Sequence, residues 1–400
     1  MKQIYPTSIT GKGDGVVPAG SVLDHKFGSS DPFTLGVEEE YMLLDGETFD
    51  LVQHIDTVLQ AISGHELEPR INAELMQSVL EIATPVCRNA GDVQHELLKL
   101  RAYVTGVARE KGLRVGSAGT HPFSLFERQR ITARDRYRNL VDQLQYIARR
   151  ELIFGMHVHV AVDDPEKAIQ VVNGLLPQLG PLLALSASSP FWRGEPTGLA
   201  SSRQMVFAAF PRSGPPPRFR DYADYAEVVG QLERTGCIAD YTHIWWDIRL
   251  HPRLGTIEIR ICDAVTRVED AVALAAYCQA LVKFLCDQYE RGEQIPSFHR
   301  ILTTENKWLA ARYGLEAPVM DLLTGARNRM PVAQLVRRTL KEIEPHAREL
   351  GSERELEGIG EILGRGNGSD RQLRVFNANR DIVEVVEEIA KATEAVPASA

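Results

Sequence analysis

Cysteine is scarce in this chain of 400 residues, and the cysteines that occur form no pattern. There are five, far apart in the sequence, and no two have the CxxC spacing: Cys87, Cys237, Cys262, Cys278 and Cys286. A disulfide framework or a cysteine-based zinc site depends on regular, close spacing. The cysteines therefore indicate reduced thiols, which are typical of a cytoplasmic protein.

Long apolar runs and excess positive charge are also absent. No stretch of roughly 18 apolar residues occurs, which is the length that a membrane span needs, so we expect no membrane segment. The formal net charge is -9, which argues against nucleic acid as a partner, because phosphate binding favours a basic surface. Residues 1–31 lack the apolar core of a secretory signal and contain five glycines, so we predict a flexible N-terminal tail.

What the chain does contain is a set of four amphipathic strand patterns, at residues 35–44, 77–84, 155–162 and 256–263. Side chains of a strand alternate between its two faces. Glu38 and Glu40 therefore share one face, and His157 lies on the same face of its strand as His159. Four such segments predict a sheet with one apolar side and one polar side that concentrates ligands for hard cations.

Between these strands, apolar residues recur at helical spacing in residues 89–111, 165–185 and 268–289. Because only one face of the sheet is polar, we expect an antiparallel or mixed sheet with helices on the other face, an α+β arrangement. The candidate site residues run from Glu38 to Arg260, so we predict a single catalytic domain over residues 32–400. A Gly-rich basic segment at 364–374 is predicted to be a loop that either closes over nucleotide phosphates or forms a surface turn. The last helix packs on the domain or on a second subunit, so a homodimer stays open.

The polar side chains suit phosphoryl transfer. Carboxylates from three strands, Glu38 with Glu40, Glu81, and Glu258, are suitable ligands for Mg²⁺, and His157 adds a nitrogen that Mn²⁺ accepts more readily. Arginines can hold carboxylates or phosphates bidentately, and the candidates are Arg193, Arg203, Arg212, Arg249 and Arg260. Together the acids and arginines indicate a site for phosphoryl transfer from ATP.

Each motif alone also has a structural explanation. The Glu38–Glu40 run could be a solvated face, the two histidines could be polar residues without a metal, and Glu258 with Arg260 could be a cross-strand ion pair. A zinc site would have fewer acids and often cysteine. The functional interpretation gains its weight from the recurrence of the pattern on four strands.

Several sequence motifs, which follow one another in a set order along the chain, give it a resemblance to a known family. The blocks that carry it include Gly36-Val37-Glu38-Glu39-Glu40-Tyr41, Leu80-Glu81-Ile82-Ala83-Thr84-Pro85, Gly155-Met156-His157-Val158-His159, Glu258-Ile259-Arg260-Ile261-Cys262-Asp263 and Glu305-Asn306-Lys307-Trp308. With these, the chain resembles the ATP-dependent carboxylate–amine ligases of the glutamate–cysteine ligase type 2 family. The matching blocks cover most of residues 34–314, and Arg371-Gln372 resembles a further one.

The resemblance implies a glutamine synthetase-like fold, with a curved, mainly antiparallel sheet whose concave face holds the active site. It implies attack of a substrate carboxylate on the γ-phosphate of ATP, and then displacement of phosphate from the acyl phosphate by an amine. The implied metal ligands are Glu38, Glu40, Glu81, His157 and Glu258. The implied catalytic residues are Arg260, Glu40 and Glu258, with Arg249, Arg371 and Arg193 toward the nucleotide and Arg203 and Arg212 toward the substrate. The wider group often carries Asn at the place of His159, so the resemblance does not make His159 a ligand.

The sequence therefore predicts an ATP-dependent ligase that joins small molecules with Mg²⁺, or Mn²⁺, as cofactor. Glutamate is the expected acid, and cysteine or another amine is the acceptor. Two alternatives stay open at this point. One is a phosphotransferase of related fold that stops at a phosphorylated acceptor, and the other is a non-catalytic protein that binds a nucleotide or a metal.

Overall fold

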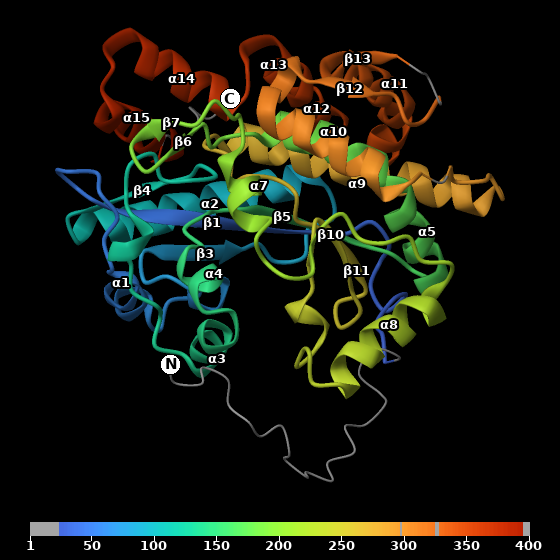
Figure 1. Cartoon of the computed structure of the whole chain (residues 1–400), viewed down its shortest axis with the longest axis horizontal. Helices are drawn as coiled ribbons and strands as arrows, with labels where there is room; N and C mark the ends of the chain where they lie inside the picture. The colour runs from blue at the N-terminus through green and yellow to red at the C-terminus, as the bar shows by residue number, and fades with distance from the viewer. Residues whose placement is uncertain (1–23, 297, 325–327, 395–400) are drawn as a thin grey trace, which may run out of the picture.

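A seven-stranded antiparallel sheet organises the protein (Figure 1). The computed structural model describes residues 24–296, 298–324 and 328–394. The strands of the sheet are β1 (Leu35–Asp45), β2 (Ile71–Ala73), β3 (Val79–Ala83), β4 (Leu113–Gly116), β5 (Met156–Ala161), β10 (Ile248–His251) and β11 (Thr256–Ile259). Their order is β10-β11-β5-β1-β3-β2, and β4 pairs with the C-terminal half of β1. The long strand β1 is therefore at the centre, and strands far apart in the sequence meet on either side of it.

Helices cover one face of this sheet in two layers (Figure 1). The inner layer consists of α2 (Ala90–Glu110), α5 (Pro165–Leu175) and α9 (Val268–Glu290). The outer layer contains α6 (Leu179–Ser186), α10 (Arg300–Tyr313), α11 (Val332–Glu349), α12 (Glu353–Leu356), α13 (Gly358–Arg365) and α14 (Gly368–Asn379). The α15 helix (Ile382–Glu394) packs on β4.

The remaining elements lie around the sheet. The helices among them are α1 (Ile55–Ile62), α3 (Asp135–Leu144), α4 (Tyr146–Arg149), α7 (Ser202–Phe207) and α8 (Tyr222–Arg234). The short strands are β6 (Phe191–Trp192), β7 (Glu195–Pro196), β8 (Ser213–Gly214), β9 (Trp245–Trp246), β12 (Pro318–Met320) and β13 (Arg329–Pro331). In Figure 1, α3 and α8 project below the sheet, away from the helical layers, and flank the face that carries the polar side chains.

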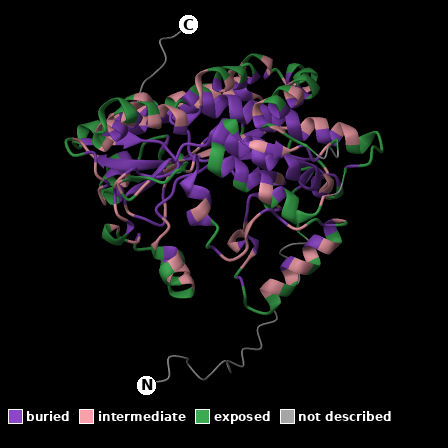
Figure 2. Cartoon of the chain, turned by 45° about the horizontal axis from the view of Figure 1, so that its top comes forward, coloured by how far each residue is buried: buried purple, intermediate pink, exposed green. Residues whose placement is uncertain are grey.

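The main core forms between the apolar side of the sheet and the inner helices. Val37, Tyr41, Val158 and Ile257 alternate with the polar positions along their strands and are almost fully buried. Figure 2 shows the sheet and the inner helices as buried, while the outer helices carry exposed faces. Because strand side chains alternate, burial of one set presents the other set on the opposite side. The predicted α+β arrangement is present.

Several sequence predictions need correction. The tail was predicted over residues 1–31, and residues 1–23 lie outside the described part of the chain. Residues 24–31 do not behave as a loose tail, because Phe27 is buried in the main core and the Gly28 amide donates to the Val162 carbonyl. The predicted loop at 364–374 is also wrong. It comprises the end of α13 and the start of α14, where Asn367 and Asp370 form a reciprocal helix cap.

One helical stretch, Pro165–Ser186, is long and apolar enough to cross a membrane by length and composition alone. The most apolar 18-residue window in it is 89% buried inside the protein. Such burial is typical of a core helix. In this structure the stretch consists of α5 and α6, which are separated by a break at Pro177.

Candidate active site

The register of the sheet brings the predicted acids and histidines face to face. Residues directly opposite in an antiparallel pair have Cβ atoms about 4.5–5.5 Å apart. The facing pairs are Glu40 with Glu81, Glu38 with His157, Glu258 with His159, and Glu258 with Arg249. These residues come from five different strands, and the pairing places their side chains in adjacent rows on the polar face.

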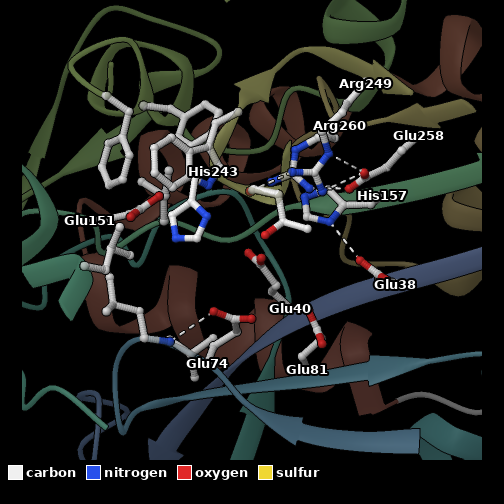
Figure 3. A pocket seen from close by; sticks show the side chains of 18 of the residues that line it. Glu38, Glu40, Glu74, Glu81, Glu151, His157, His243, Arg249, Glu258 and Arg260 are labelled. Carbon is white, nitrogen blue, oxygen red and sulfur yellow. Dashed lines mark hydrogen bonds and ion pairs between the residues drawn. The ribbon is translucent and has the colours of Figure 1, made fainter. Parts of the chain in front are cut away.

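These side chains line one cavity of about 310 Å³ on the polar face. Figure 3 shows Glu38, Glu40 and Glu81 pointing into it from the strands, with Glu258 and Arg260 beside them. Glu74 and Glu151 approach from the opposite wall. Six carboxylates and four guanidinium groups line the cavity, which leaves it with a formal charge of two negative when the histidines are neutral.

The carboxylates divide into two electrostatic classes, and one class is short of positive charge. Burial raises the pKa of Glu40 to about 7, and the charge of Glu74 adds to the shift. Burial also raises the pKa values of Glu74, Glu81 and Glu151, and neighbouring carboxylates contribute to each shift. Acids that repel one another in this way are stabilised when a cation lies among them.

Glu258 belongs to the other class, since two arginines pair with it. Its carboxylate accepts from Arg249 Nε at 2.8 Å and is paired with Arg260. Burial alone would raise the pKa of Glu258, but Arg249 and Arg260 hold it well below the ordinary range. The Arg260 amide also donates to the Asp247 carbonyl at 2.8 Å, which anchors this arginine directly after β11.

Arg203 reaches the cavity from α7 and is almost fully buried. Its guanidinium donates to the carbonyls of Ile261 and Arg260 at 3.3 and 3.4 Å. Within the described residues, neither its Nε nor that of Arg260 has a hydrogen-bond partner. Buried donors without partners are suited to receive a carboxylate or phosphate of a substrate.

Three predicted arginines are not brought into this cavity. Arg193 is on the surface, where it pairs with Glu127. Arg212 donates from Nε to the His243 carbonyl and lies over the Trp245 ring, so it is behind the cavity wall.

Arg371 pairs with Asp270 at 2.8 Å and lines a separate cavity of about 250 Å³ between α14 and α15. The assignment of these three arginines to ATP or substrate stays a prediction.

The cavity also contains residues that sequence reasoning missed. Glu74 follows β2, Glu151 follows α4, and Arg136 lies on α3. None of them stands in an alternating strand pattern, so nothing in the sequence distinguishes them from solvated surface charges. The sequence could have indicated His251, at the end of β10, as a site residue. It lies two residues after Arg249 in the same strand, so the two side chains share one face.

The donor set fits a hard divalent cation. Carboxylate oxygens and imidazole nitrogens dominate the cavity, and no thiol lines it. One oxygen each of Glu38 and Glu258 and one ring nitrogen of His159 all lie within 4.8 Å of one another. This trio contains two of the predicted metal ligands, Glu38 and Glu258, and its nitrogen comes from His159.

Comparison with known proteins assigns the family. The model of the family "Glutamate-cysteine ligase family 2 (GCS2)" matches residues 34–391, which is most of the chain. The chain belongs to this family. The GCS2 match spans every residue that lines the cavity, from Glu38 to Arg260.

Relatives extend over nearly the whole GCS2 chain. "Putative glutamate--cysteine ligase 2-1" of Rubrobacter xylanophilus is 43% identical over 364 residues, covering 91% of this chain and 95% of the relative. "Putative glutamate--cysteine ligase 2" of Sorangium cellulosum is 43% identical over 358 residues, covering 89% and 95%. The predicted family is therefore confirmed, and with it the ligase class that the family's description names.

Solved structures support the fold. A glutamate–cysteine ligase of Francisella tularensis, in complex with AMP, superposes with a TM-score of 0.65 at 13% identity, covering 92% of this chain and 90% of that one. A bifunctional glutathione synthetase of Pasteurella multocida gives a TM-score of 0.67 at 16% identity, covering 91% and 52%. At such low identity the likeness concerns the fold, and it confirms the predicted fold class.

Proposed function

We propose that this GCS2 protein is an ATP-dependent ligase that activates the carboxylate of glutamate as an acyl phosphate and joins it to the amine of cysteine or of another small molecule. The observation that carries the proposal is the convergence of Glu38, Glu40, Glu81 and Glu258 with Arg260 in one buried cavity. Phosphoryl transfer needs positioned positive charge and metal-binding carboxylates more than it needs covalent chemistry from the protein.

The reaction that these residues suit has two steps. In the first, a carboxylate oxygen of glutamate attacks the γ-phosphorus of ATP, and the bond to ADP breaks. In the second, the amine nitrogen attacks the acyl carbon, phosphate leaves, and the nitrogen loses a proton. Both steps develop negative charge on oxygens, which the guanidinium groups of Arg203, Arg249 and Arg260 can stabilise from the cavity wall.

The acids have a different role in this proposal. Glu38, Glu40, Glu81 and Glu258, with His157, are the residues that would hold divalent ions, in agreement with their donor types. Bound Mg²⁺ would neutralise the phosphate oxygens of ATP. The negative balance of the cavity supports this, because a triphosphate could not enter it without added cations.

A labelling experiment tests the reaction. The purified protein is given ATP, Mg²⁺, a panel of amines, and glutamate whose side-chain carboxylate carries ¹⁸O. An acyl-phosphate ligase releases ADP and an amide, and one ¹⁸O atom from glutamate appears in inorganic phosphate. A phosphotransferase would instead leave a stable phosphorylated compound and no labelled free phosphate, and a binding protein would release no ADP.

Matched variants link the result to the cavity. Glu40→Gln and Glu258→Gln should abolish ADP release, and the circular dichroism spectrum should be unchanged for Glu40→Gln. Glu258→Gln also removes the counter-charge of Arg249 and Arg260, so it is assayed at a temperature where its spectrum still shows the folded protein. Glu66→Gln is the control, since that side chain is on the surface and pairs with Lys99. Turnover that survives both cavity substitutions would overturn the assignment of the site.

Small-molecule substrates agree with the limited volume of the cavity, about 310 Å³. The identity of the amine, a cytoplasmic location and a homodimer stay predictions. Gel filtration with light scattering would decide the oligomeric state.

A further inference from the structure

The positive charge of Arg203 is balanced from behind the cavity wall. Arg249 and Arg260 both pair with Glu258, whose carboxylate itself lines the cavity. Among the residues that the structure describes, the acid paired with Arg203 is Asp263, 3.8 Å from Nη1. Asp263 is fully buried and does not line the cavity. This counter-charge takes no space in the cavity, so the Arg203 guanidinium stays available to an anion there.

Three donors fix the Asp263 carboxylate. It accepts from the Ser188 amide at 3.0 Å, from Ser189 Oγ at 2.7 Å and from Ser201 Oγ at 2.8 Å. Burial raises the pKa of Asp263, and Arg203 together with these donors opposes the shift. Hydrogen bonds to an ionised carboxylate are short and strong, so this charge has a fixed place behind the wall.

The same cluster fixes the backbone of Arg203. The Ser189 hydroxyl donates to Asp263 and accepts from the Arg203 amide at 3.2 Å, in the first turn of α7. The Ser202 amide donates to the Ser189 carbonyl at 2.9 Å, and Ser189 forms a β-bridge with Ser201. Asp263 therefore joins the segment after α6 to the start of the helix that carries Arg203.

The guanidinium group itself fits closely into its place. Its two terminal nitrogens donate to the carbonyls of Ile261 and Arg260, and a Cβ atom on Gly155 would lie only 2.4 Å from Nη2. A displacement of about 1 Å in a positioned group can lower a rate by about 100-fold. The position of Arg203 is therefore a property that a reaction in this cavity depends on.

We propose that Asp263 is a positioning residue for the ligase reaction, and that it holds Arg203, by its charge and through Ser189, where the guanidinium meets an anionic oxygen of the substrates. Because it lies outside the cavity, Asp263 itself contacts no reacting atom. The inference rests on the proposed function for the role of Arg203, and part of its test needs no turnover.

A double-mutant cycle tests whether Asp263 acts through Arg203. Asp263→Asn keeps the size of the side chain and removes its charge, and Arg203→Met removes the guanidinium. In the ADP-release assay we expect Asp263→Asn to lower kcat by about tenfold or more. In the Arg203→Met background the same change should lower kcat by less than about twofold, because the group that it positions is already absent.

Asp321→Asn is the matched control. Asp321 is also buried and accepts from a backbone amide, a hydroxyl and an arginine, which are those of Leu323, Thr324 and Arg338. It follows β12, away from the cavity. We expect Asp321→Asn to lower the urea midpoint and to leave kcat unchanged, with and without Arg203→Met.

A binding cycle separates this inference from the proposed function. Calorimetry measures the affinity of the same variants for glutamate and for ATP with Mg²⁺. Asp263→Asn and Arg203→Met should each weaken binding of the same ligand by about tenfold, and the double variant should bind no more weakly than Arg203→Met. Ser189→Ala, which removes only the hydroxyl link, should have a smaller effect in the same direction, and it replaces Asp263→Asn in both cycles if that variant does not fold.

Independent, additive losses from Asp263→Asn and Arg203→Met would overturn the proposal, because they would give Asp263 a general role in stability. A folded Asp263→Asn protein with wild-type kcat and affinities would overturn it as well. Both results are compatible with full ligase activity in the wild-type protein. Non-additive binding in a protein that forms no amide would support the positioning role and contradict the ligase reaction instead.

Discussion

Two neighbouring glutamates on β1 should respond in opposite ways to the same substitution. Glu39 points to the helical side of the sheet, is fully buried, and accepts from Arg101 Nε at 3.0 Å and from Arg101 Nη2. Glu40 points into the cavity, where it accepts the Gly155 amide at 2.6 Å. Changing each to glutamine alters one atom and removes one charge. Comparison of the two variants therefore isolates the effect of the face of β1 on which the side chain lies.

For Glu39→Gln we expect a large loss of stability. The amide nitrogen of glutamine would face the donors of Arg101, and the buried guanidinium would lose its counter-charge. Breaking a buried, hydrogen-bonded ion pair in this way typically costs about 3–5 kcal/mol. Adding Arg101→Met should recover part of the loss, because the second change removes the uncompensated charge.

For Glu40→Gln we expect no loss of stability in the metal-free protein. Its pKa is raised from 4.5 to about 7, so the folded state disfavours the ionised form that the unfolded chain adopts. The wild-type protein therefore loses stability as the pH rises above 4.5, and at pH 7 the neutral glutamine should be more stable by about 1–3 kcal/mol. Turnover should nevertheless disappear.

Urea unfolding of the metal-free protein, followed by circular dichroism, measures both effects, and ADP release measures activity. The expected pattern is a lower midpoint for Glu39→Gln, and an equal or higher midpoint without activity for Glu40→Gln. Equal loss of stability in the two variants would refute the assignment of the two side chains to opposite faces of β1.

Three further predictions concern other parts of the molecule. A Cβ atom on Gly155 would lie 2.4 Å from the Arg203 guanidinium, so Gly155→Ala should displace that arginine. Steady-state kinetics should show kcat/KM lowered by about tenfold or more, and urea unfolding should show a stability loss of about 1–3 kcal/mol. The surface pair of Arg193 with Glu127 contributes at most about 1 kcal/mol to stability, so Arg193→Ala should stay folded; a large rise in its KM for ATP would support the predicted nucleotide contact, and an unchanged KM would refute it. Burial lowers the pKa of His121 from 6.5 to about 4, so stability should fall by about 2 kcal/mol between pH 8 and pH 5, and His121→Gln should remove that part of the pH dependence in urea titrations.

The long helices and the face of each strand could be predicted because they depend on local patterns. Apolar spacing of three and four residues identified α2 and α9, and alternation identified which side of β1 carries Glu38 and Glu40. The segment at 364–374 misled the same reasoning. Its glycines suggested a loop, but the Asn367 cap and burial of Gln372 against Ser188 stabilise a helix there.

The arrangement of the site could not be predicted in the same way. Glu40 and Glu81 face one another because β3 pairs with β1 in one register, and a shift by one residue would separate them. Glu74 and Glu151 enter the cavity from connecting segments with no periodic pattern, and Arg193 and Arg371 find acidic partners elsewhere.

The amino-acid sequence by itself determined the chemistry that is available: strands with acids and histidines on one side, helices for the other side, and a family of ligases that such motifs resemble. Only the tertiary structure decided which of these groups meet, since pairing between distant strands and the packing of α3, α4 and α7 set distances that no local pattern encodes. For the same reason, the closeness of Glu38, His159 and Glu258 became visible only when β1, β5 and β11 were paired.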